Sequence, residues 1–138
     1  MIAVIDSSIA LNWLLHDEHT PESDRFFDFV SDQGAIVPSL WRLEIANALQ
    51  VAVRRKRIDG VYRDRAIQDL QRLPIEVDSE TDAHAWTTTL QLSERHTITV
   101  YDAAYLELAL RRGVPLATRD RDLARAALES GVTVLHTN

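Results

Sequence analysis

Short apolar segments of β character recur along the chain, and segments with helical periodicity separate them. These apolar runs are nearly continuous rather than alternating with polar residues, which is typical of parallel strands covered on both faces. The pattern predicts an α/β fold: a three-layer sandwich with a mainly parallel sheet of about five short strands flanked by helices. The expected strands are residues 2–5, 35–38, 74–77, 115–118 and 132–135.

Helix start and stop signals divide the intervening segments. The expected N-caps are Ser7 or Ser8, Ser39, Asp102 and Asp120, because their side chains accept hydrogen bonds from free backbone N–H groups. Glycines are expected to end several of the helices. The helices are expected to run through residues 9–14, 21–33, 40–57, 66–70, 79–95, 102–112 and 120–130.

The length of 138 residues predicts one domain, residues 1–138. No cysteine is present, so disulfides and thiolate metal sites are excluded. The first residues do not resemble a signal peptide, and no apolar run approaches the ~20 residues that span a bilayer, so we expect a cytoplasmic protein without membrane contact. A net charge of −6 argues against nucleic-acid binding by a global positive field. The basic run 54–57 fits either RNA contact or the end of a helix.

Acidic side chains follow two of the expected strands and open one of the helices. Asp6 comes directly after the first strand, Asp120 lies just past the fourth, and Asp102 lies at a turn into a helix. Ligands of open α/β sheets bind beyond the carboxyl ends of the strands, so we expect these carboxylates to converge at one edge. Each aspartate taken alone is also explained as a helix N-cap.

Glu44 lies on an apolar face of its expected helix, together with Leu40, Trp41 and Ala48. A carboxylate in such a place is costly unless a metal, a cation or hydrogen bonds compensate it, and Asn47 is placed to donate one. The alternative is that Glu44 lies at the solvent edge of the helix.

Several carboxylates that converge without His or Cys suit a hard cation, Mg²⁺ or Mn²⁺, and phosphodiester hydrolysis is the natural reaction class. The five histidines are scattered and show no ligand spacing, so we expect them to be surface or structural residues.

The segments 4–10, 38–48, 99–106 and 116–120 together resemble the motifs of PIN domains, specifically VapC-type toxins of toxin–antitoxin pairs. They occur in the family's order and span essentially the whole chain. The resemblance assigns Mg²⁺ or Mn²⁺ binding and catalysis to Asp6, Glu44, Asp102 and Asp120, with Ser8, Asn47 and Thr118 as supporting residues. Whether the nearby Asp122 joins them stays open, because a first-turn aspartate also complements the helix dipole.

The resemblance further implies a metal-dependent endoribonuclease that acts on RNA, forms a homodimer and is neutralised by a small VapB-like antitoxin. Trp13, Phe26, Phe27 and Phe29 offer apolar surface for the dimer, and the surface near Trp13 and Trp41 offers it for the antitoxin. A Mg²⁺-dependent phosphatase is disfavoured, because such enzymes usually have a second aspartate two residues after the first, where this chain has Ser8. A phospho-acceptor receiver domain would need a late lysine, which is absent, and a degenerate PIN scaffold would have lost an acidic residue.

Overall fold

The strands form one parallel sheet in the computed structural model, which describes residues 2–15 and 21–135. The strand order is β3-β2-β1-β4-β5, and every neighbouring pair is parallel. This confirms the predicted α/β fold with a parallel sheet. The strands are β1 (Ala3–Ile5), β2 (Ala35–Val37), β3 (Ile75–Val77), β4 (Leu116–Ala117) and β5 (Val134–Leu135).

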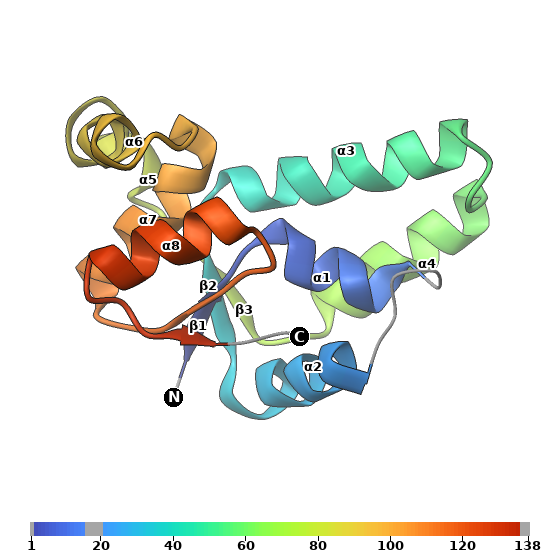
Figure 1. Ribbon diagram of the computed structural model, residues 1–138. Helices are drawn as coiled ribbons and strands as arrows, with labels where there is room; N and C mark the ends of the chain where they lie inside the picture. The colour runs from blue at the N-terminus through green and yellow to red at the C-terminus, as the bar shows by residue number, and fades with distance from the viewer. Residues whose placement is uncertain (1, 16–20, 136–138) are drawn as a thin grey trace.

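Helices cover the sheet on both sides, with α1 to α4 on one side and α5 to α8 on the other (Figure 1). Within the described part of the chain, no helix is both long enough and apolar enough to span a membrane. The helices are α1 (Ser7–Leu14), α2 (Pro21–Gln33), α3 (Leu40–Arg54), α4 (Gly60–Gln71), α5 (Thr81–His84), the π-helical turn η2 (Ala85–Thr89), α6 (Leu90–His96), α7 (Val100–Arg112) and α8 (Arg121–Glu129).

Two helices begin at other residues than the sequence predicts. Asp6 rather than Ser7 or Ser8 caps α1, since its carboxylate accepts from the Ile9 backbone N–H at 3.3 Å. Thr99 rather than Asp102 caps α7, because its hydroxyl accepts from the Asp102 backbone N–H at 3.0 Å. Asp102 is therefore in the first turn of α7, and its carboxylate is not used as a cap.

Two predicted helices also differ in their course. The helix expected to reach Arg57 ends at Arg54, because Lys56 takes a left-handed conformation with φ 61°. The helix expected over 79–95 contains the π-helical turn η2, an insertion often found at functional sites. Trp86 on this turn is 91% exposed.

The order of the strands fixes where a ligand site can form. From β1 the chain first builds outward through β2 and β3, and then returns to place β4 on the other side of β1. The strand order therefore reverses between β1 and β4, and the crevice beyond the carboxyl ends at such a point is the usual ligand site of open α/β sheets. Asp6 and Thr118 are the first residues after these two strands.

A buried ion cluster ties the end of β3 to α7. Arg111 donates to Asp78 at 2.7 Å and to Glu107 at 2.8 Å, and both of these acidic side chains are buried. The Arg111 guanidinium holds the pKa of Asp78 below its ordinary value. Because one cation serves two buried carboxylates, the cluster depends on Arg111.

Arg111→Ala is expected to lower the free energy of unfolding by about 3 kcal/mol or more, because it leaves two buried carboxylates without a cation. The neighbouring Arg112 pairs with exposed Glu76, so Arg112→Ala is a matched control that should cost less than about 1 kcal/mol. Urea unfolding of both variants measures the difference. Equal losses would show that the buried cluster contributes no more to the free energy of unfolding than the exposed ion pair does.

Candidate active site

Asp6 is a buried carboxylate at the edge of the sheet, with 6% of its surface exposed. Ser8 Oγ donates to Asp6 Oδ1 at 2.6 Å, and Thr118 Oγ1 donates to Oδ2. The strand register explains the second bond: Ile5 on β1 pairs with Ala117 on β4, which brings the next residues of the two strands together. The structure therefore places both hydroxyls of the predicted supporting residues Ser8 and Thr118 on Asp6.

The same two hydroxyls also hold the loop between β4 and α8. The Asp120 backbone N–H donates to Thr118 Oγ1 at 3.0 Å, and the Arg119 backbone N–H donates to Ser8 Oγ at 3.2 Å. Asp120 in turn caps α8 by accepting from the Leu123 backbone N–H. The position of Asp120 at the site is thus coupled through Thr118 to the position of Asp6.

Asp102 and Glu44 come from two helices that meet over this edge. Asp102 is half-buried in the first turn of α7, and Glu44 is half-buried on α3. The hydroxyl of Tyr105 donates to Glu44 Oε1 and so links the two helices. Asn47, predicted to hydrogen-bond Glu44, is exposed and makes no such bond among the described residues.

The pKa values indicate that these carboxylates interact electrostatically. Burial raises the pKa of Asp6 to about 6, although its hydrogen bonds from Ser8 and Thr118 act in the opposite direction, and the Asp102 charge raises it further. Burial also raises the pKa of Asp102, followed by the charges of Asp120 and Glu44 and, as a smaller contribution, of Asp122. The four predicted carboxylates therefore lie in one electrostatic neighbourhood.

No basic side chain of the described residues neutralises this group. Asp6, Glu44, Asp102 and Asp120 make no ion pair with Lys, Arg or His in residues 2–15 and 21–135. Asp122 differs, because it lies 3.9 Å from Arg125 and its side chain is 76% exposed. A group of acidic side chains without a cation of its own suits a bound metal ion.

The arrangement of the carboxylates suits a cation that keeps part of its water shell better than a cation bound only by protein oxygens. Within the described residues, no three Asp, Glu or His side chains lie close enough together to hold one ion directly. Mg²⁺ commonly keeps several waters and uses only one or two protein carboxylates, so a water layer can bridge such a gap. Oxygen-only ligands also favour Mg²⁺ or Mn²⁺ over Zn²⁺.

Two neighbouring residues were not predicted from the sequence. Tyr105 lies three positions after Asp102, a spacing that puts both on one face of α7. Arg119 donates from Nη1 to the buried Asn12 and carries a cation at the rim of the site, between Thr118 and Asp120. Of the described histidines, His96 is structural, because it is buried between Glu129 and Ser130; His16, His19 and His136 lie outside the described residues.

The chain belongs to the PIN domain family, whose family model matches residues 3–129. Among its relatives, Ribonuclease VapC3 of Mycobacterium tuberculosis is 36% identical over 93 residues, which cover 66% of this chain and 57% of the relative. The chain thus aligns with little more than half of that protein. Ribonuclease VapC3 of Pyrobaculum aerophilum is 28% identical over 90% of this chain and 93% of the relative.

Solved structures share the fold at lower sequence identity. PAE2754 from Pyrobaculum aerophilum has a TM-score of 0.70 and 20% identity, over 97% of this chain and 83% of that one. VapBC2 from Rickettsia felis, bound to a DNA fragment from its promoter, has a TM-score of 0.70 and 10% identity over the full length of both chains. These comparisons confirm the family and the fold that the sequence motifs predict.

Asp6→Asn is expected to stabilise the metal-free protein at about pH 8 by up to about 3 kcal/mol, the equivalent of its pKa shift. The folded pKa of about 6 exceeds the unfolded value of 3.8, so the carboxyl favours folding at low pH and loses that contribution as the pH rises through about 6. The gain should therefore shrink toward about pH 4.

Urea unfolding in the presence of a chelator, at several values between about pH 4 and pH 8, measures this gain. A gain that does not change with pH, or a loss of stability near pH 8, would show that the ionised Asp6 carboxylate does not destabilise the folded protein.

Proposed function

We propose that this protein is a divalent-metal-dependent endoribonuclease, the toxin of a toxin–antitoxin pair, with Asp6, Glu44, Asp102 and Asp120 as the catalytic carboxylates. The observation that carries the proposal is the convergence of these four side chains, without a basic partner, at the β1–β4 switch point. Membership of the PIN domain family and similarity to proteins named ribonucleases support it.

Some of these side chains would bind the metal, and others orient the side chains that bind it. Asp6, Asp102, Glu44 and Asp120 would bind Mg²⁺ or Mn²⁺, and Ser8 and Thr118 orient Asp6 by their hydrogen bonds. When bound, the cation would polarise a phosphoryl oxygen, lower the pKa of a water and stabilise the leaving oxygen. Without it, the negative charge of the site would repel an RNA phosphate.

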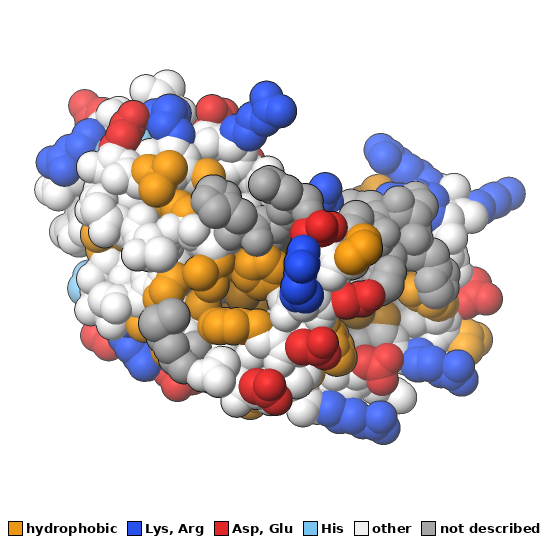
Figure 2. Space-filling model, turned by 60° about the horizontal axis from the view of Figure 1, so that its bottom comes forward, with side chains coloured by type: hydrophobic (Ala, Val, Ile, Leu, Met, Phe, Trp, Pro, Cys, Tyr) orange, Lys and Arg blue, Asp and Glu red, His pale blue; other side chains and the backbone are white. Residues whose placement is uncertain are grey.

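The distribution of the basic side chains bears on how RNA would be bound. On the face that Figure 2 presents, the described Lys and Arg side chains are scattered among acidic and apolar ones. The basic run 54–57 begins about 15 Å along α3 from Glu44 and lies at the far end of the α3–α4 hairpin (Figure 1). The backbone of Arg119 lies against Ser8, and its guanidinium, which donates to Asn12, would contact a neighbouring phosphate.

Asp102→Asn is expected to reduce Mg²⁺-dependent RNA cleavage by at least about a hundredfold while the fold stays intact, because the summed ligand charge falls. Asp122→Asn is the matched control from the start of α8. Since Asp122 is exposed and has its own partner in Arg125, it should lose less than about threefold.

Cleavage of a labelled RNA across a Mg²⁺ titration, with circular dichroism as a check on folding, tests the proposal. Near-full activity of Asp102→Asn, or equal loss in both variants, would overturn the assignment of the site.

Two mainly apolar hollows on the α3–α4 side of the molecule would suit an antitoxin as the partner. One hollow of about 440 Å³ lies between α3, α4 and β3 and includes Trp41, Ile45 and Ala46 among its lining. A second of about 400 Å³ contains Trp13, and Leu70 and Leu73 line both. An amphipathic partner segment fits such surfaces, and an arginine from it would pair with the carboxylates and compete with the metal.

Inhibition of the purified enzyme by its proposed antitoxin should therefore weaken as Mg²⁺ rises. Ala46→Asp, at an exposed position in the first hollow, should weaken the partner's binding at least about tenfold, because it buries a charge in an apolar contact. Val61→Asp, at an exposed position of α4 outside both hollows, is the control. Inhibition that depends on neither metal nor Ala46 would reject this docking.

We also propose a homodimer, for which the structure offers a second candidate surface beside the predicted one. Phe26 is buried and Phe29 packs against the core, so these two offer little free surface, whereas Phe27 is 40% exposed. Trp86 and Leu90, on η2 and α6, are large exposed apolar residues that a partner subunit would cover.

A further inference from the structure

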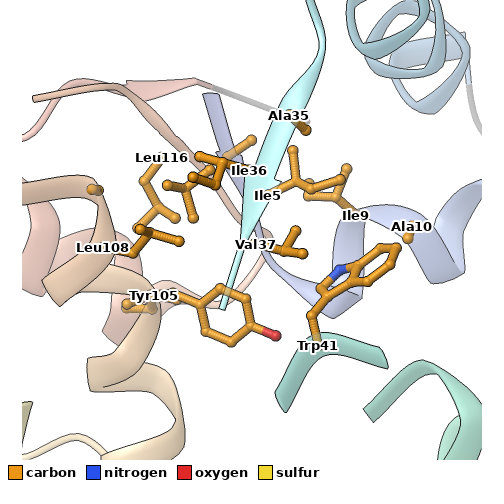
Figure 3. Close-up of a cluster of buried hydrophobic side chains, with 14 of the residues drawn as sticks. Ile5, Ile9, Ala10, Ala35, Ile36, Val37, Trp41, Tyr105, Leu108 and Leu116 are labelled. Carbon is orange, nitrogen blue, oxygen red and sulfur yellow. The ribbon is translucent and has the colours of Figure 1, made fainter. Parts of the chain in front are cut away.

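Tyr105 combines a core position with a polar contact at the proposed metal site. Its ring packs among buried strand residues, and 1% of its surface is exposed. Figure 3 shows the ring beside Val37, with the hydroxyl directed away from Leu108 and toward the start of α3, which carries Trp41. One turn further along α3 is Glu44, whose Oε1 accepts the hydrogen bond from this hydroxyl.

The hydroxyl is not needed to fill the core. A phenylalanine would supply the same ring without a polar group that requires a partner when buried. The hydroxyl moreover has a half-buried carboxylate on another helix as a partner, and Ser7 at the start of α1 as a second one. Since Asp102 lies one turn before Tyr105 on the same face of α7, this single bond connects the helix of Asp102 to Glu44.

We propose that Tyr105 is a positioning residue that fixes the Glu44 carboxylate beside Asp102 before the metal binds, an inference that rests on the proposed function. With Oε1 held by the Tyr105 hydroxyl, Oε2 is left for the cation or its water shell. A glutamate without this bond would lose rotamer freedom each time a metal binds. Because of this bond, the Glu44 side chain is already ordered in the folded protein before the metal binds.

The test compares Mn²⁺ binding by the wild type, Tyr105→Phe, Glu44→Ala and the double variant, with free Mn²⁺ measured by electron paramagnetic resonance. Tyr101→Phe is the matched control, because Tyr101 lies on the same helix and is 68% exposed. Thermal unfolding of each metal-free variant separates an effect on the fold from one on the site. Cleavage of RNA is measured in parallel.

Tyr105→Phe is expected to bind Mn²⁺ roughly three- to tenfold more weakly, the size expected for ordering one side chain. Tyr101→Phe should bind as the wild type does. In the Glu44→Ala background, Tyr105→Phe should cause no further loss, because the group through which it acts is gone. The metal-free melting temperature of Tyr105→Phe should stay within a few degrees of the wild type.

The inference is overturned if Tyr105→Phe binds Mn²⁺ as well as the wild type, or if it weakens binding equally with and without Glu44. In either case a wild type that binds Mn²⁺ and cleaves RNA leaves the proposed function standing. A wild type that does neither overturns both.

Discussion

The hydrogen bond from Thr118 to Asp6 joins the two halves of the sheet at the point where the strand order reverses. It depends on the pairing of β1 with β4, which sets the two residues side by side. Through the Thr118 hydroxyl the bond also fixes the Asp120 backbone, and through Ser8 the same carboxylate is tied to the Arg119 backbone. The part of the site that carries Asp6 and Asp120 is therefore assembled from loops that the sheet itself holds in register.

Buried and half-buried carboxylates are balanced in two different ways in this molecule. Asp78 and Glu107 share the guanidinium of Arg111, which lowers the pKa of Asp78 and ties β3 to α7. Asp6 and Asp102 have no such cation among the described residues, and burial raises the pKa of both. The first arrangement stabilises the fold, whereas the second leaves charge without a cation, as expected if the proposed metal site departs from what stability alone favours.

Much of this could be predicted from local patterns. Continuous apolar runs predicted the parallel strands, and the residues that follow them predicted Asp6 and Asp120 at one edge. The strand order could not be derived from the residues alone. The contact between Asp6 and Thr118 depends on that order, so it could not be derived either; the family resemblance implied only that Thr118 is a supporting residue. The bond from Tyr105 to Glu44 joins residues 61 positions apart, so neither residue's own helix reveals it. Asp120 caps α8 as predicted, whereas the predicted caps of α1 and α7 were wrong by one to three residues, because Ser, Thr and Asp compete for the same role.

Diffraction from crystals soaked in Mn²⁺, measured where manganese scatters anomalously, tests the central claim most directly. We predict an anomalous peak at the carboxyl ends of β1 and β4, within direct or one-water reach of Asp6, Glu44 and Asp102, and its loss in Asp102→Asn. A protein that cleaves RNA with Mn²⁺ but shows no peak there, or shows its peaks only at other carboxylates such as Asp78 and Glu107, would contradict this account.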